Sequence, residues 1–501
     1  MFVRAASIAS TCLCVSLSLH LNLIHPIVAV SLPARATSTN TTDVAALLNS
    51  KKWSANTTIA YPGSAGFADQ TLRWTIFDAP TYSAVITPGN EQDVIQAVKL
   101  CREHAFPFLA TGGRHGYTTT LGDLHLGLAI DLSNFDRVQV DSSAATVTIG
   151  GATRASQLFD PLYEAGFMIQ SGSCSCVGYV GVTLGAGVGR LQGEFGLLID
   201  ALKSVRMVTA EGKLITVSAT ENSELFWGIR GAGFNFGVVV SATYKLQPLI
   251  NNDWQPSPSS ITTVQLRRQV LLIELSNSPY KRTNTPQTQI LSNWVYFGPE
   301  DEARKALAPI LNAKPSTADF SRVPWNKLLA TSGWGQFDAS VCQKNVNRDL
   351  YATVVRNLSA STYNQAFSKM DKFFADYPNA RYSSVEFEIF PNRAMLAVPN
   401  DETAYPWRDA LRYVSQSYIG FSADDTTTLS AVEALAKELR TSFAATSGYP
   451  DLAVYVSYAH GDETLDQRYG ANKLPRLAAL KKKWDPSNVF AYNNALPTSY
   501  P

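Results

Sequence analysis

The residues best suited to chemistry lie in a glycine-rich stretch from Ser171 to Asp200. Five glycines fall within twelve residues of it, interleaved with aliphatic side chains: Gly178, Gly181, Gly185, Gly187 and Gly189. Glycine loses more backbone freedom on folding than other residues, so this density is expected where φ is positive or the backbone closely approaches a ligand. Successive free N–H groups there can form a concave nest for phosphate. We interpret the stretch as a loop that wraps a large, flat, diphosphate-bearing cofactor.

Two cysteines, Cys174 and Cys176, stand at the mouth of this loop. Outside the N-terminal leader the chain has too few cysteines for a disulfide scaffold of this size; they are Cys101, Cys174, Cys176 and Cys342. Cys101 falls on an apolar helical face and is interpreted as a buried small hydrophobe. No metal is predicted, because the other histidines show no ligand spacing with cysteines or carboxylates: His104, His125 and His460.

The N-terminus is typical of a secretory signal peptide. Arg4 precedes an apolar run over 5–19, and small residues suited to cleavage follow, so residues 1–31 are predicted to be removed. Polar residues from His20 onward end the run before the ~20 apolar residues that a membrane span needs. Three Asn-X-Ser/Thr triplets then predict N-glycosylation of a secreted protein, at Asn40, Asn56 and Asn357.

The composition is that of a globular protein with more than one domain, since 501 residues are 45% hydrophobic and 17% charged. The net charge is only +1, which gives no electrostatic basis for binding nucleic acid or an anionic membrane. The expected partner is a small-molecule substrate, and we expect a monomer.

Strands and helices alternate ahead of the glycine-rich stretch. A strand over 83–88 leads to a helix capped by Asn90. A second strand, 106–110, runs into another glycine turn, Thr111–Tyr117, and further strands and a helix follow at 128–132, 145–149 and 155–166. This order predicts an α/β or α+β ligand-binding domain.

Composition changes near Pro248, where a segment over 250–262 rich in Asn, Asp, Pro and Ser predicts a domain boundary. Strand-like and helical runs alternate from there to about residue 454, which predicts a second, α+β domain: strands over 289–297 and 382–389, helices over 362–375 and 429–444. The lysines at 481–483 are interpreted as a solvated last turn that complements a helix dipole.

Four segments together resemble the berberine-bridge-enzyme-like FAD-linked oxidases, whose flavin domain is of the vanillyl-alcohol-oxidase (PCMH) type. They occur in the family's order and spacing: Gly112–Tyr117, Gly172–Asp200, Leu225–Gly233 and Lys483–Phe490. Any one alone would be weak evidence, because a bare GxGxG pattern matches many unrelated loops. The resemblance covers most of residues 80–250 and 455–501.

The resemblance implies a two-domain α+β fold in which the antiparallel sheet of a substrate domain covers the flavin. The implied parts are a lead-in (32–79), an FAD-binding domain (80–250), the substrate domain (251–460) and a C-terminal segment that returns to the FAD domain (461–501).

It also implies covalent FAD. His115 matches the histidine that bonds to the 8α-methyl group, and Cys174 matches the cysteine that bonds to ring position C6 in bicovalent members. The loop departs from the common pattern at Ser175, Cys176, Val182 and Gly116, and a disulfide between Cys174 and Cys176 is the alternative. The other implied FAD-binding residues are Thr111, Gly112, Gly113, Arg114, Gly116, Tyr117, Val177, Gly178, Gly181, Val182, Gly185, Gly187, Gly189, Asp200, Gly237, Val238 and Asn493.

The implied catalytic base is a tyrosine or an acid on the substrate-domain sheet, and the segment 454–460 resembles the strand that carries it. Alternation along a strand would put Tyr455 and Tyr458 on opposite faces. Tyr458 is the preferred candidate and Tyr455 the second, and a structural role for both is the alternative. Because tyrosine has an ordinary pKa of ~10, it needs help to ionise, and the expected neighbours are Arg412 and Tyr413.

The resulting hypothesis is a secreted FAD-dependent oxidase. The base takes a proton from a substrate hydroxyl, hydride passes to the flavin, and O₂ reoxidises the flavin to give H₂O₂. In this resemblance the valine at Val177 implies room for O₂ beside the flavin. Similarity to fungal members of secondary metabolism favours an alcohol, phenol or polyketide-like substrate. The alternatives are a carbohydrate oxidase, a flavin-containing cyclase or pericyclase, and a flavin-binding protein without activity.

Overall fold

The computed structural model describes residues 43–249, 260–268, 288, 290–315, 317–335, 337–422 and 424–500. The predicted signal peptide and Asn40 lie outside the described residues, whereas Asn56 and Asn357 are exposed. In the part of the chain that is described, no helix has both the length and the apolar composition needed to cross a membrane.

The first sheet arises from the strand–helix–strand order that the sequence predicts. Its four strands lie in the order β1 (Thr58–Ala60), β2 (Tyr82–Thr87), β4 (Gly127–Asp131) and β3 (Phe108–Thr111), and the last three are parallel. Helix α3 (Glu91–Glu103) crosses from β2 to β3, and the Asn90 cap is confirmed, because its Oδ1 accepts the Asp93 N–H at 3.0 Å. The turn Thr111–Tyr117 is thereby fixed at the carboxyl end of β3.

The second sheet has five antiparallel strands in the order β5 (Val138–Asp141), β6 (Thr146–Gly150), β10 (Val238–Lys245), β8 (Leu202–Val208) and β9 (Leu214–Ser218). Valines of β8 and β10 share a core with α3 and the first sheet. Other side chains of the same strands pack with α4 (Ser156–Glu164), α5 (Tyr179–Gly185) and α8 (Ser223–Ala232). Since α5 carries the first part of the glycine-rich stretch, this packing fixes where the loop lies.

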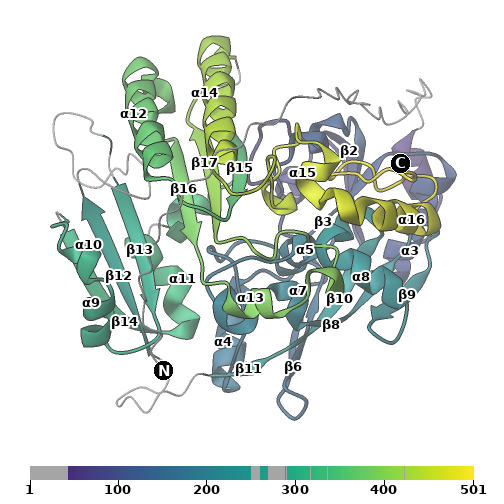
Figure 1. Cartoon of the computed structure of the whole chain (residues 1–501). Helices are drawn as coiled ribbons and strands as arrows, with labels where there is room; N and C mark the ends of the chain where they lie inside the picture. The colour runs from purple at the N-terminus through teal and green to yellow at the C-terminus, as the bar shows by residue number, and fades with distance from the viewer. Residues whose placement is uncertain are drawn as a thin grey trace, which may run out of the picture. The chain divides into compact units, whose positions relative to one another are not determined.

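Beyond the predicted boundary, an antiparallel sheet of β15 (Arg348–Val355), β17 (Arg412–Ile419) and β16 (Ser384–Ile389) has two unlike faces. One face packs against the predicted helices, which are α12 (Ala360–Asp376) and α14 (Thr426–Ala445). Figure 1 shows these two long helices side by side over the strands. The other face is polar and lines a cavity. A further sheet has the order β13 (Ile290–Tyr296), β12 (Ser260–Arg268) and β14 (Thr317–Pro324).

The C-terminal helices α15 (Leu465–Tyr469) and α16 (Leu474–Trp484) bury their apolar side chains in the core that contains α8. Lys481 is not solvated as predicted. It is buried and forms an ion pair with Asp485 at 2.7 Å. The Asp485 carboxylate also accepts the N–H groups of Val489 and Phe490, so the buried charge is fully paired and shapes the final motif.

Candidate active site

A cavity of about 1050 Å³ lies between the two glycine turns and the polar face of the β15–β17–β16 sheet. Most residues predicted to bind a cofactor line it: Thr111, Gly112, Gly113, Arg114, His115, Gly116, Tyr117, Cys174, Val177, Gly178, Gly181, Val182, Gly237, Val238 and Asn493. We call residues 111–117 and 172–182 the glycine wall. We call the facing side chains the sheet wall: Ser384, Glu386, Glu388, Ser415, Ser417 and Tyr458.

The two turns of the glycine wall contact each other through their backbones. A Cβ added to Gly113 would overlap the N of Gly178 and lie 2.7 Å from its Cα, and one added to Gly112 would lie 2.8 Å from the carbonyl oxygen of Gly151. The next residue, Arg114, has a φ of 55° and is held by a buried ion pair with Asp131 at 2.8 Å. Glycine is therefore required at positions 112 and 113 by close approach.

The cavity fits a cofactor that is bound largely by backbone. A Cβ added to Gly172 or Gly181 would meet no atom within 4 Å, so the wall is open at both positions. The hydroxyl of Thr111 is buried in the lining without a hydrogen-bond partner. Buried polar groups are normally paired, so this hydroxyl suits a ligand with hydrogen-bonding groups, as FAD has.

His115 is held as a neutral imidazole. Its ring stacks on Trp74 with centroids 4.3 Å apart and planes 18° from parallel, and the Arg348 guanidinium lies 4.4 Å from the centre of the same indole. Desolvation, reinforced by the charge of Arg348, lowers the pKa of His115 to about 3. A neutral imidazole keeps a free lone pair, which a nucleophile that bonds to an electrophilic ring substituent needs.

The cysteines are paired in a way that the sequence did not indicate. Cys176 forms a disulfide with Cys342, and Cys174 is free. The alternative of a Cys174–Cys176 disulfide is therefore wrong, because Cys176 is already bonded. The side-chain ligand atoms of His115, Cys174 and Cys176 all lie within 4.8 Å of one another. A disulfide sulfur is no thiolate, so this group does not form a three-ligand metal site.

Glu388 of β16 is the main candidate site residue that the sequence analysis did not name. Its Oε2 accepts the Tyr458 hydroxyl at 2.7 Å, and its Oε1 accepts the Ser173 hydroxyl at 2.6 Å. Desolvation raises the pKa of Glu388, although these two hydrogen bonds oppose the shift. Burial and the Glu388 charge raise the pKa of Tyr458 well above its usual value. The carboxylate is thus the group that can ionise, and the tyrosine links it to the cavity.

Tyr455 does not line the cavity. The predicted strand over 454–460 is instead a short 3-10 helix, Val456–Tyr458, which brings the rings of Tyr455 and Tyr458 to 4.9 Å rather than to opposite faces. The Tyr455 hydroxyl accepts the Gly187 N–H at 3.0 Å and donates to the Val182 carbonyl at 3.3 Å. Burial raises the pKa of Tyr455 to about 12. Its geometry is that of a support for the glycine-rich stretch, not of a base.

Four residues predicted to bind the cofactor also lie outside the cavity lining. Three are glycines at which a Cβ would collide with a neighbouring segment: Gly185 with Ser457, Gly187 with Leu198, and Gly189 with Ser171. The fourth, Asp200, forms a buried ion pair with Arg408 at 2.7 Å. Their part of the predicted loop folds back on the protein, and its glycines serve chain packing.

One of the two predicted neighbours of Tyr458 is confirmed and the other is wrong. Tyr413 lies beside it, with ring centroids 6.5 Å apart. Arg412 does not, because adjacent residues of β17 point to opposite faces of the sheet, and its guanidinium donates to the Leu411 carbonyl. The alternating polar residues of β16 could have revealed Glu388, whereas Trp74 and Cys342 reach the site from distant segments without any local signal.

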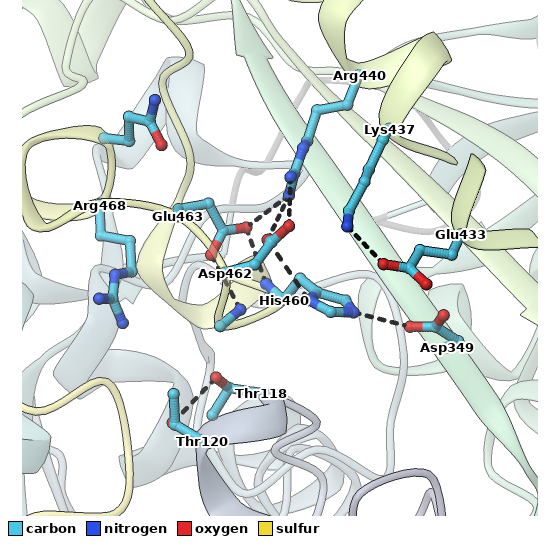
Figure 2. A network of polar contacts seen from close by, with 12 residues as sticks. Thr118, Thr120, Asp349, Glu433, Lys437, Arg440, His460, Asp462, Glu463 and Arg468 are labelled. Carbon is cyan, nitrogen blue, oxygen red and sulfur yellow. Dashed lines mark hydrogen bonds and ion pairs between the residues drawn. The ribbon is translucent and has the colours of Figure 1, made fainter. Parts of the chain in front are cut away.

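Figure 2 shows an ionic network around His460, which follows the 3-10 helix Val456–Tyr458 by two residues in the chain. His460 Nε2 lies 3.1 Å from Asp349 of β15, and its Nδ1 lies 3.4 Å from Asp462, which also binds Arg440. Burial alone would lower the pKa of His460, but the bonds to both carboxylates outweigh it and raise the pKa to about 9. Glu463 also accepts the backbone N–H of His460, so both the backbone and the side chain of His460 are held in place.

Comparison with known proteins agrees with this arrangement. The model of an FAD binding domain matches residues 82–218, and the berberine and berberine-like model matches residues 454–497. The first segment includes both glycine turns, and the second includes Tyr458 and the C-terminal motif. Fold and cavity therefore define an FAD-dependent oxidoreductase.

The chain belongs to the FAD-linked oxidoreductases that join an FAD binding domain to a berberine-like C-terminal segment. It is 47% identical over 465 residues to the FAD-linked oxidoreductase fogF of Aspergillus ruber, covering 90% of this chain and 93% of that protein. The fold matches BBE-like 1 of Physcomitrella patens with a TM-score of 0.75 at 21% identity, over 92% of this chain and all of the other. It also matches the glucooligosaccharide oxidase of Acremonium strictum, which carries a 6-S-cysteinyl, 8α-N1-histidyl FAD (TM-score 0.73, 21% identity, 91% and 99% covered). The predictions of the family, the fold class and the FAD cofactor are confirmed.

Proposed function

We propose that the protein is a secreted, N-glycosylated oxidase whose FAD is bonded to His115 and Cys174, and that it oxidises a hydroxyl-bearing small molecule. The observation that carries this proposal is the Glu388–Tyr458 pair, in which an ionisable carboxylate on the cavity wall accepts a 2.7 Å hydrogen bond from the Tyr458 hydroxyl. Bound FAD supplies the acceptor for hydride, and the chain must supply position and a base.

Glu388 acts as that base through Tyr458. The Tyr458 hydroxyl donates to Glu388 Oε2, so its oxygen is left to accept a hydrogen bond from a substrate hydroxyl. As the substrate loses its proton to Tyr458, the tyrosine passes its own proton to Oε2. Desolvation raises the pKa of Glu388, which makes its carboxylate a stronger base.

The rest of the sheet wall favours a substrate with several hydrogen-bonding groups. The register pairs Ser384 with Ser417 and Glu386 with Ser415, so hydroxyls and a second carboxylate face the cavity in adjacent rows. An alcohol, phenol or polyketide-like metabolite suits such a wall, and Val177 leaves room for O₂ on the other side. The neutral His115 and the free Cys174 support attachment at both, as in the Acremonium enzyme.

The test is to mix the purified holoenzyme with candidate alcohols and phenols, first without and then with O₂. The oxidase proposal predicts that an active compound bleaches the flavin anaerobically and that air then yields one H₂O₂ per product molecule. Product formed without bleaching or H₂O₂ would favour the cyclase alternative. Failure of every compound to bleach the flavin, with Glu388→Gln indistinguishable from wild type, would contradict an enzymatic role for this cavity.

A further inference from the structure

Three sulfur atoms from two distant segments meet beside His115. Cys174 and Cys176 come from the glycine wall, and Cys342 follows the short π-helix Phe337–Val341 far along the chain. Only Cys174 of the three is unbonded, and it lines the cavity. Its sulfur lies within 4.8 Å of the Cys176 sulfur, which is already bonded to Cys342.

The position of Cys342 is set by contacts other than its disulfide. The Ser175 N–H donates to Asp338 Oδ1 at 3.0 Å, and the Trp74 indole donates to the Val341 carbonyl. On the other side of Cys342, the Arg348 guanidinium donates to the Gln343 carbonyl at 2.9 Å. These bonds bring Cys342 to Cys176, which favours their pairing over any rival pairing.

The rival pairing is within geometric reach. Cys174 and Cys176 flank a turn at Ser175, and two residues span at most ~7 Å even when fully extended. Disulfides form at Cα separations of about 4.4–6.8 Å, so a turn between the two cysteines suffices. Without a partner for Cys176, the chain would hold two adjacent thiols in an oxidising compartment.

We propose that the Cys176–Cys342 disulfide keeps Cys174 unpaired and thereby reserves its sulfur for attachment to the flavin. In that attachment a sulfur–carbon bond would replace the thiol S–H bond and the C–H bond at ring position C6, and the two hydrogens would leave with O₂ as H₂O₂. The claim that Cys174 is reserved for the flavin rests on the proposed function. The claim that the disulfide keeps Cys174 unpaired concerns only the pairing of the cysteines. The disulfide thus determines which bond Cys174 can form, because it occupies the neighbouring Cys176, which would otherwise pair with Cys174.

The arrangement is also stable against exchange. A thiol attacks a disulfide as the thiolate, and desolvation, together with the nearby carboxylates of Asp338 and Glu388, raises the pKa of Cys174. The thiol therefore exchanges slowly with the disulfide. When Cys342 is absent, a small-molecule disulfide such as oxidised glutathione can take two hydrogens from Cys174 and Cys176, which leaves a Cys174–Cys176 bond and two reduced glutathione molecules.

The experiment maps tryptic peptides of the full secreted chain, unreduced and alkylated. Residues 155–190 carry Cys174 and Cys176, residues 328–344 carry Cys342, and residues 115–137 carry His115. In the wild type we expect a disulfide between 155–190 and 328–344 and a flavin bridge between 155–190 and 115–137. In Cys342→Ser, matured with oxidised glutathione, we expect peptide 155–190 to contain an internal disulfide and to lose the flavin, while His115 keeps its bond to the flavin.

The matched control is the double variant Cys176→Ser/Cys342→Ser. It also lacks the tether between the two segments but leaves Cys174 no partner, so the flavin should return to Cys174. A double variant as defective as the single one would overturn the proposal, since the tether rather than the competing thiol would then matter. Cys174 found unpaired in Cys342→Ser would overturn it as well.

Two further readouts separate this inference from the proposed function. If the wild type has no flavin on Cys174, the second linkage is refuted, and so is the reservation of Cys174 for it. The pairing claim is tested even then, because alkylation of the denatured wild type freed of flavin should label Cys101 and Cys174 alone among the cysteines of residues 43–500. A wild-type Cys174–Cys176 bond would refute the pairing claim itself. This last measurement needs no variant to fold.

Discussion

The two walls of the cavity present different chemical groups to a ligand. The glycine wall presents backbone, and its turns touch where a single added Cβ on Gly113 would overlap Gly178. The sheet wall presents side chains of two strands and of the 3-10 helix that carries Tyr458, with Glu388 and Tyr458 hydrogen-bonded to each other. They meet where Ser173 donates to Glu388 at 2.6 Å, one residue before the free Cys174.

This difference determines how freely the sequence of each wall can change. Backbone recognition tolerates few substitutions, so the cofactor site carries a strong sequence pattern. A strand can present almost any side chain without a change of fold, so the sheet wall can be adapted to another substrate at little structural cost. The choice of substrate should therefore depend on the sheet wall rather than on the glycine wall.

Breaking the glycine wall should have the largest effect. Gly113→Ala places a Cβ where the backbone of Gly178 lies, and backbone cannot move aside. We expect the protein to lose FAD completely, measured as the ratio of flavin absorbance to protein absorbance. The matched control is Gly116→Ser in the same turn, whose added Cβ would meet only side-chain atoms at 3.7 Å or more and should leave FAD bound.

Breaking the sheet wall should leave FAD in place and remove the chemistry. Glu388→Gln removes the proposed base, and the loss of general base catalysis typically lowers kcat about 10²–10⁴-fold. Wild-type kcat should fall as the pH drops through the raised pKa of Glu388, because the carboxylate gains a proton, and this acid limb should vanish in the variant. The control is Glu386→Gln, on the same face but outside the bond to Tyr458; an equal loss there would contradict the assignment.

The ionic network around His460 should make the stability of the fold depend on pH. Because the pKa of His460 is raised to about 9 from ~6.5 in the unfolded chain, its ion pairs stabilise the fold fully below pH 6.5 and lose that contribution as the pH rises through 9. The shift corresponds to roughly 3 kcal/mol. The melting temperatures of wild type and His460→Gln should thus differ most near pH 6 and converge above pH 9. A constant difference would show that His460 is not charged.

The smallest effect is expected from a change at Tyr455, which supports the glycine-rich stretch from outside the cavity. Tyr455→Phe leaves the Gly187 N–H without its acceptor, which should cost about 1–3 kcal/mol of stability. The value of kcat should stay at the wild-type level, because Tyr455 does not line the cavity. A loss of kcat as large as that of Glu388→Gln would return Tyr455 to the list of candidate bases.

The sequence predicted the parts of the molecule that local patterns determine and did not predict those that depend on distant contacts. The Asn90 cap, the turn at Thr111–Tyr117 and helix α14 were predicted, because local patterns determine them. The 3-10 helix at Tyr458 was not predicted, because an apolar run with two tyrosines fits a strand equally well. Lys481 was assigned to solvent since its buried partner Asp485 becomes evident only in three dimensions.

The most direct test of the account is the fate of the colour when the purified protein is precipitated with acid. We predict that the yellow flavin stays with the pellet and that peptide mapping finds it on residues 115–137, at His115. Colour released into the supernatant as free FAD, with His115 unmodified, would contradict the covalent site. It would reduce the glycine wall to a cradle that binds FAD without bonding to it.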